Sequence, residues 1–212
     1  MNNTPKVPIP TLERLATYFR YLADLRSMAV ETISSTEVEK QTGINAAQFR
    51  KDLSYFGEFG KPGVGYNIVD LQNRIAQILR IDRDQHVIVL GAGNLGSALA
   101  GYPGLREQGF NIVAVFDASE QKIGQSLFGL AVKDIARLRE ENNRLQARIA
   151  VIAVPASAAQ GVADLAVASG VRALMNFAPT ILKVPDKIVV RNVSFLQELA
   201  VLSYHLTADA QK

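Results

Sequence analysis

The sequence predicts an α/β protein in which an N-terminal winged helix-turn-helix precedes a Rossmann domain, a doubly wound parallel sheet. Three observations carry this prediction. Apolar residues recur at helical spacing up to about residue 80, short continuous apolar runs alternate with helical segments after it, and a glycine-rich turn joins the first run to a helix. The polar run at 82–85 separates the two patterns, so we place the domains at 1–82 and 83–192, with a C-terminal helix at 193–212.

Composition narrows the class of protein. The 212 residues include no cysteine, which excludes disulfides, thiolate metal sites and cysteine nucleophiles and is typical of the reducing cytoplasm. No run approaches the roughly 20 apolar residues that cross a bilayer, and the first ten residues hold three prolines where a signal peptide is apolar. We therefore expect a cytoplasmic protein without a membrane partner. The formal net charge of +3 is too small to predict nucleic-acid binding by itself.

Two longer helices frame the N-terminal domain. Apolar residues repeat every three or four positions over 12–23 and again over 71–79, which is typical of amphipathic helices that pack on a small core. The glycine-rich segment 57–66 lies between them and is spaced as a short hairpin or wing.

Two short helices are expected inside that frame. Ser34 or Thr36, each followed three residues later by glutamate, begins the first with a capping box. Asn45 begins the second, and Gly43 supplies the turn between them. Two short helices joined by a tight turn form a helix-turn-helix.

The second short helix has a face suited to DNA. Phe49, Leu53 and Phe56 share the face that must point inward, while Asp52 at the flank argues mildly against DNA binding. Lysine reaches base acceptors and phosphates, glutamine matches an adenine edge, and hydroxyl groups bond phosphate oxygens. A helix-turn-helix can also serve as a plain protein-binding module. The candidate DNA-binding residues, with one from the wing, are Gln48, Arg50, Lys51, Ser54, Tyr55 and Lys61.

The C-terminal domain reads as alternating strands and helices. Its continuous apolar runs are typical of strands buried on both faces of a parallel sheet, and the helices between them complete β-α-β units. The predicted strands are 87–90, 112–116, 149–154, 171–177 and 188–190, and the predicted helices are 95–100, 135–145 and 158–168.

The turn after the first strand has the spacing of a dinucleotide site. Gly91 permits the tight turn, Gly93 lets the backbone approach a pyrophosphate, and Gly96 allows close packing of helix on strand. Asp117 ends the next strand, where a carboxylate can accept both ribose hydroxyls and repel a 2′-phosphate, which favours NAD(H) over NADP(H). The alternative is a Rossmann-like fold without a dinucleotide. The candidate residues here are Gly91, Ala92, Gly93, Asn94, Leu95, Gly96 and Asp117.

Two further strand ends are expected at the same crevice, because ligands of open parallel sheets bind outside the carboxyl ends of the strands. Apolar side chains there suit a nicotinamide ring, although Phe177 is equally compatible with an ordinary core position. The candidates are Val154, Pro155, Phe177, Ala178 and Pro179.

With these motifs the chain resembles the Rex family of redox-sensing transcriptional repressors, over about residues 6–206. The resemblance is most specific at 49–57 with 63–66, and it recurs at 97–104 and 176–179. It implies a homodimer with a domain-swapped C-terminal helix that binds palindromic operator DNA. It also implies that NAD⁺ permits operator binding, that NADH releases it, and that neither form is turned over.

The resemblance assigns further roles. It places Tyr102, Phe177 and the partner subunit's Phe195 around the nicotinamide, and it makes Arg20, Tyr102 and Ser194 the residues that couple the redox state to DNA binding. Two positions depart from the family pattern. Many relatives carry aspartate at Ser194 and arginine at Pro62, so we expect a less firmly held NAD⁺ state and, unless Lys61 compensates, a weaker minor-groove contact.

The residues alone also support dimerisation. The helix after Ser194, which forms a capping box with Gln197, is apolar on more than one face and needs burial from several sides. A partner subunit can provide that burial, and docking within the chain is the alternative.

Two other functions are alternatives to a repressor. An NAD-dependent dehydrogenase needs a proton donor beside the nicotinamide and a substrate domain, but the only histidines are His86, entering a strand, and His205, on the last helix. We therefore expect no enzyme activity. The third interpretation is a nucleotide-binding scaffold that docks a protein.

Overall fold

The computed structural model describes residues 7–59 and 65–208, with the side chains of 207 and 208 left out. The chain divides into two compact units, Met1–Arg83 (unit 1) and Asp84–Lys212 (unit 2). Each unit is described by itself below.

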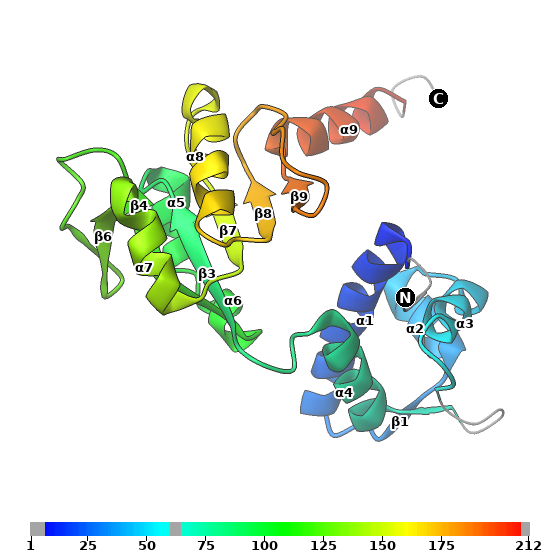
Figure 1. The fold of residues 1–212 in the computed structure, drawn as a ribbon. Coiled ribbons are helices and arrows are strands. Elements are labelled where there is room, and N and C mark those ends of the chain that lie inside the picture. Colours follow the sequence, from blue (N-terminus) through cyan, green and yellow to red (C-terminus); the bar gives the residue numbers. More distant parts are fainter. Residues whose placement is uncertain (1–6, 60–64, 209–212) are drawn as a thin grey trace. The chain divides into compact units, whose positions relative to one another are not determined.

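Unit 1 is a helical domain with a small sheet (Figure 1). Tyr18 and Phe49 meet edge to face in its core, with ring centroids 4.8 Å apart, so the first helix packs directly on the third. The elements are α1 (Ile9–Ser27), β1 (Thr32–Ile33), α2 (Ser35–Thr42), α3 (Ala46–Ser54), β2 (Tyr66–Asn67) and α4 (Ile68–Leu79).

The helix-turn-helix has the start and stop signals that the sequence predicts. Ser34 and Glu37 form the capping box of α2, so the alternative start at Thr36 is wrong: Thr36 already lies inside the helix. Gly43 ends α2 in the left-handed conformation, with φ of 70°. Asn45 then caps α3 by accepting a hydrogen bond from the backbone N–H two residues on, at 2.8 Å.

The strand after the glycine-rich segment pairs differently from a simple hairpin. β2 is antiparallel to β1, with Ile33 opposite Tyr66, and β1 precedes the helix-turn-helix. The end of the predicted wing, at Tyr66, therefore pairs with the strand that precedes the helix-turn-helix. Lys61 and Pro62 lie outside the described residues.

Unit 2 is a seven-stranded sheet in the order β5-β6-β4-β3-β7-β8-β9. All neighbouring pairs are parallel except β5 with β6, so the six strands from β6 to β9 have the doubly wound order. The short strands β5 and β6 and helix α6 were not predicted. The strands are β3 (Gln85–Leu90), β4 (Phe110–Asp117), β5 (Ser126–Leu127), β6 (Leu130–Asp134), β7 (Ile149–Ile152), β8 (Ala173–Asn176) and β9 (Val189–Asn192).

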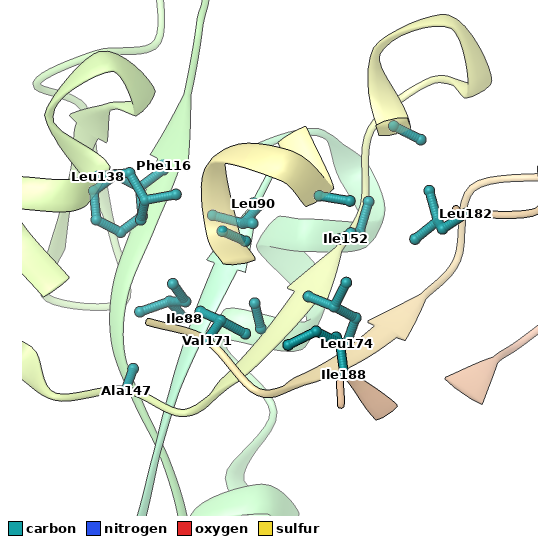
Figure 2. Packing of buried hydrophobic residues seen from close by; sticks show 14 of the residues in the cluster. Ile88, Leu90, Phe116, Leu138, Ala147, Ile152, Val171, Leu174, Leu182 and Ile188 are labelled. Atoms are coloured by element: carbon teal, nitrogen blue, oxygen red, sulfur yellow. The ribbon is translucent and has the colours of Figure 1, made fainter. Parts of the chain in front are cut away.

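Both faces of the sheet are covered, as continuous apolar strands require. Along β3, Ile88 and Leu90 belong to the core cluster shared with α7 and α8 (Figure 2), while Val87 and Val89 belong to the cluster on the α5 face. This alternation follows the period of two of a strand. The helices of unit 2 are α5 (Asn94–Ala100), α6 (Pro103–Glu107), α7 (Leu138–Leu145), preceded by the 3₁₀ turn η1 (Ile135–Arg137), α8 (Ala156–Ala168) and α9 (Phe195–Ala208).

Helix α9 differs from the other helices because its apolar side chains are exposed. Among the described residues, no helix is both long and apolar enough to cross a membrane. The exposed apolar residues of α9 are Phe195, Leu196, Leu199, Val201, Leu202, Tyr204 and Leu206.

Candidate functional sites

The turn between β3 and α5 is built so that two of its glycines cannot be replaced. Gly91 has φ of 108°, and a Cβ there would collide with the carbonyl oxygen of Ala153; a Cβ on Gly96 would collide with the carbonyl oxygen of Gly91. Gly93 is different, since a Cβ there meets no atom within 4 Å. The turn is therefore closed on its protein side and open at Gly93, which is the geometry that lets a pyrophosphate approach the backbone.

Asp117 lies beside this turn at the end of β4. Its Oδ2 accepts hydrogen bonds from the backbone N–H of Ala92 at 2.7 Å and from Nζ of Lys122 at 3.2 Å, and its Oδ1 accepts one from the N–H of Ser119 at 2.8 Å. Burial raises the pKa of the carboxyl, but these donors outweigh it and hold the pKa below its usual value. The group is an anion at neutral pH.

The predicted apolar wall follows two neighbouring strands. Because Leu90 pairs with Ile152, and Ile152 with Asn176, the carboxyl ends of β3, β7 and β8 lie side by side. A Cβ on Gly91 would lie 2.9 Å from a methyl carbon of Val154, so this wall adjoins the glycine turn. The residues placed at these strand ends are Val154, Pro155, Phe177, Ala178 and Pro179.

Asn176 holds the loop that carries Phe177. Its Nδ2 donates to the carbonyl oxygen of Thr180 at 2.9 Å and to Oδ1 of Asn192 at 2.9 Å, and its Oδ1 accepts from the N–H of Ala178 at 3.0 Å. The side chain is buried. This role of Asn176 has no signature in the sequence, although a buried asparagine at a strand end is typical of a side chain that organises a loop.

The start of α9 contacts this loop within the same chain. The rings of Phe177 and Phe195 have centroids 6.1 Å apart, and Phe195 remains 62% exposed. Ser194 accepts a hydrogen bond from the N–H of Gln197 at 3.3 Å, which is one of the two bonds of the predicted capping box. The assignment of the partner subunit's Phe195 to the nicotinamide stays a prediction.

Tyr102 lies at the opposite end of α5 from the glycine turn. The helix has 7 residues, or about 10 Å, and Tyr102 follows its last turn. The ring is exposed and lines a hollow of about 650 Å³ with residues from the starts of β3 and β4, among them His86 and Phe110. Arg20 is exposed on α1 in unit 1. The roles of Tyr102, Arg20 and Ser194 in coupling also stay predictions.

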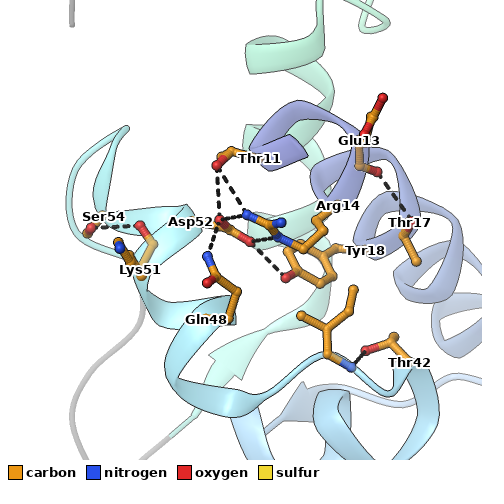
Figure 3. A network of polar contacts seen from close by, with 11 residues as sticks. Thr11, Glu13, Arg14, Thr17, Tyr18, Thr42, Gln48, Lys51, Asp52 and Ser54 are labelled. Atoms are coloured by element: carbon orange, nitrogen blue, oxygen red, sulfur yellow. Dashed lines mark hydrogen bonds and ion pairs between the residues drawn. The ribbon is translucent and has the colours of Figure 1, made fainter. Parts of the chain in front are cut away.

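In unit 1, α3 presents the expected polar face. Phe49 and Leu53 are buried, while Arg50, Lys51 and Ser54 are exposed. The hydroxyl of Ser54 donates to the carbonyl oxygen of Lys51 at 2.8 Å (Figure 3). Two other candidates on this helix, Gln48 and Tyr55, are half-buried.

Asp52 does not oppose DNA binding, contrary to the sequence interpretation. Its side chain is fully buried and accepts hydrogen bonds from Arg14, Thr11, Tyr18 and Gln48 (Figure 3). Burial raises its pKa, but the bonds from Arg14 and the other donors lower it below the usual value. The negative charge is therefore neutralised inside unit 1. Its bond to the Nε2 of Gln48, at 2.8 Å, also fixes which way that amide points.

Comparison with known proteins finds matches for both units. The family model described as "Putative DNA-binding protein N-terminus" matches residues 6–54, and the model described as "CoA binding domain" matches residues 82–180. Redox-sensing transcriptional repressor Rex of Syntrophomonas wolfei is 46% identical over 96% of this chain and 97% of its own. The chain belongs to the Rex family. The Rex repressor of Carboxydothermus hydrogenoformans is 45% identical, over 96% of this chain and 98% of its own.

Solved Rex-family structures confirm the predicted fold. The crystal structure of RSP, a Rex-family repressor, matches with a TM-score of 0.89 at 35% identity, covering 97% of this chain and 96% of that one. RSP in complex with β-NAD⁺ and operator DNA gives 0.91 at 36% identity, over 97% and 94%. RSP in complex with β-NADH gives 0.88 at 34% identity, over 97% of both chains. The match covers both the helix-turn-helix of unit 1 and the Rossmann sheet of unit 2.

Proposed function

We propose that this chain is a redox-sensing transcriptional repressor in which unit 1 binds operator DNA and unit 2 binds NADH or NAD⁺. The observation that carries the proposal is the presence, in one chain, of a glycine turn open at Gly93 beside Asp117 and of a helix-turn-helix whose α3 exposes cationic and hydroxyl groups. Relatives that match over nearly the full length are named redox-sensing transcriptional repressor Rex. RSP has been crystallised with β-NADH and, separately, with β-NAD⁺ and operator DNA.

The residues of unit 2 fit a dinucleotide. The open space at Gly93 admits the pyrophosphate, the charged Asp117 binds the adenosine ribose, and the apolar loop at Phe177 shields the nicotinamide. The bound cofactor supplies a difference in charge, because the nicotinamide ring is cationic in NAD⁺ and neutral in NADH. The switch therefore requires that one conformation of this chain binds one form of the nicotinamide ring, cationic or neutral, more tightly than the other form.

The residues of α3 divide by their contacts with DNA. The ammonium of Lys51 and the guanidinium of Arg50 suit phosphates and guanine edges, while Ser54 and Tyr55 bond phosphate oxygens. Gln48 reads a base edge with an amide that Asp52 has already oriented. Lys61 adds a contact from the wing.

The repressor works as a homodimer joined through α9. A helix with exposed Leu199, Leu202 and Leu206 is apolar over a surface that unit 2 leaves uncovered, and a second copy can bury it symmetrically. Two-fold symmetry of the protein requires a palindromic operator with half-sites separated by whole helical turns.

The switch is a shift in population between two dimer conformations. A cofactor moves that equilibrium only by its difference in affinity for the two states, and a nearly complete swing needs about 5.5 kcal/mol, which two sites can share. Arg20, Tyr102 and Ser194 carry the signal to unit 1. Since serine brings no charge, Ser194→Asp is expected to raise the affinity for NAD⁺ relative to NADH in calorimetry; an unchanged ratio removes this role.

We infer that the dinucleotide is an effector and is not turned over, and that the protein acts in the cytoplasm, where its operator is. The two histidines support this: Nδ1 of His86 lies 2.7 Å from the carbonyl oxygen of Leu145, away from the glycine turn, and His205 is exposed on α9. If the protein oxidised NADH with a small carbonyl compound as substrate, the dehydrogenase alternative would be favoured instead.

Selection of bound duplexes from a random pool tests the proposal. Performed with NAD⁺, it is expected to enrich a palindrome; performed with NADH, it is expected to enrich little. Enrichment of unsymmetrical sequences, or equal enrichment with both forms, contradicts the repressor model.

A further inference from the structure

Asp117 has a cationic neighbour that the sequence analysis did not consider. Nζ of Lys122 lies 3.2 Å from Oδ2, with 40% of the lysine side chain and 13% of the aspartate side chain exposed. The same oxygen accepts from the N–H of Ala92 in the glycine turn. The ammonium group, the carboxylate and the turn therefore adjoin one another, where an adenosine ribose binds if the proposed function holds.

The pair limits how the ribose can be held. A carboxylate offers about four lone-pair sites, and the N–H groups of Ala92 and Ser119 together with Lys122 already use three of them. About one site remains, on Oδ1, so the carboxylate cannot accept both ribose hydroxyls while Lys122 keeps its place. An ammonium group has three donors, and those not used by Asp117 are available to the oxygen of the second hydroxyl.

The pair also changes the charge at this position. Asp117 alone presents one negative charge, which repels a ribose 2′-phosphate, whereas Asp117 and Lys122 together sum to zero. A group bonded to the remaining site on Oδ1 is separated from Nζ only by this carboxylate, close enough for a substantial interaction in a partly buried site.

We propose that Lys122 is a specificity-determining residue, which binds the 2′ position of the adenosine ribose and weakens the discrimination against NADPH that Asp117 imposes. This inference rests on the proposed function of unit 2 and adds the residue that sets its choice between dinucleotides. It replaces the expectation that Asp117 alone holds both ribose hydroxyls.

The test is the ratio of dissociation constants for NADPH and NADH, measured by calorimetry and competition on the full-length protein. Lys122→Met is expected to raise this ratio about tenfold, mainly by weakening NADPH, and Lys122→Arg is expected to keep it within about twofold. The same pair of variants in an Asp117→Ser background keeps NADPH binding measurable, since the repelling charge is absent there.

Lys133→Met is the matched control. Lys133 also forms an ion pair with a partly buried carboxylate of unit 2, that of Glu141, but this pair lies on the face of the sheet that α7 covers. Its removal is expected to leave the ratio unchanged, and thermal melting checks that each variant is folded. If the wild-type protein binds NADH and Lys122→Met leaves the ratio unchanged in both backgrounds, the role of Lys122 is wrong while the dinucleotide site stands. If no dinucleotide binds the wild-type protein, both proposals are wrong.

Discussion

Arg14 and Asp52 join α1 to α3 through two parallel hydrogen bonds: Nε to Oδ2 at 2.6 Å and Nη2 to Oδ1 at 2.7 Å. This bidentate arrangement is the strong form of an arginine–carboxylate pair and fixes direction as well as distance. Helix α3, which bears the DNA-binding candidates, is therefore held in place by α1, the helix that bears Arg20. Any movement of α1 is expected to carry α3 with it.

Breaking that pair is expected to destabilise unit 1. Asp52→Ala leaves the Arg14 guanidinium without its partner in a mostly buried position, which costs about 3 kcal/mol in the free energy of unfolding. Urea denaturation followed by circular dichroism measures the loss. The exposed pair of Arg137 with Glu140 is the control, and Glu140→Ala should cost less than about 1 kcal/mol. Equal effects of the two variants would show that the Asp52 network contributes little.

The stability of unit 1 is also expected to depend on pH in the acid range. The folded-state pKa of Asp52 lies below that of the unfolded chain, so its contribution is complete above about pH 4 and is lost as the pH falls through the folded value. Unfolding free energies measured between pH 6 and pH 3 should fall for the wild-type protein. Asp52→Asn should show a shallower decline, and a parallel decline would exclude Asp52 as its source.

Gly93 and Gly96 of the turn are expected to respond differently to alanine. Gly93→Ala adds a methyl group in open space, so the protein should melt normally yet bind NADH at least about tenfold more weakly, because the methyl group occupies the path of the pyrophosphate. Gly96→Ala adds one against the carbonyl oxygen of Gly91 and should lower the melting temperature. Normal NADH affinity in Gly93→Ala contradicts this placement of the dinucleotide.

Lys51 is expected to contribute an electrostatic contact with DNA. Lys51→Ala should weaken operator binding and reduce the slope of log affinity against log salt by about 1, as the loss of one phosphate contact does. Fluorescence anisotropy at several salt concentrations measures both quantities. Lys187→Ala removes an exposed lysine from unit 2 and should change neither. An unchanged slope with reduced affinity would instead indicate that Lys51 reads a base.

The exposed face of α9 is expected to carry the dimer. Replacing both Leu199 and Leu202 by glutamate should convert the protein to a monomer in sedimentation experiments, because charges cannot be buried in an apolar interface without partners. Operator affinity should fall with it. Met28→Glu changes an exposed apolar residue of unit 1 and should leave the mass unchanged. A dimer that survives the double substitution places the interface elsewhere.

The parts that the sequence predicted are those with a local signature. The glycine turn and Asp117 could be assigned because spacing along the chain fixes both the turn and the end of the next strand. Likewise, Ser34 and Gly43 mark their helix ends through contacts within a few residues. The short strands β5 and β6 were missed because a hairpin of so few residues leaves no repeating pattern.

The parts that the sequence did not predict depend on distant partners. Asp52 was interpreted as a charge at the flank of α3 because its partner Arg14 lies 38 residues away along the chain. Lys122 is one lysine in a polar turn, and only the geometry shows that it meets Asp117. The burial of Asn176 similarly follows from tertiary packing, which periodicity does not contain.

Occupancy of the glycine turn by reduced dinucleotide is expected to govern how tightly unit 1 binds DNA. Titrating NADH into a preformed complex of the protein with its operator, in the presence of NAD⁺, measures this directly through the anisotropy of the labelled duplex. Saturable release of the duplex is expected for the wild-type protein, and no release is expected for Gly93→Ala. Retention of the duplex at NADH concentrations that saturate the protein would contradict it.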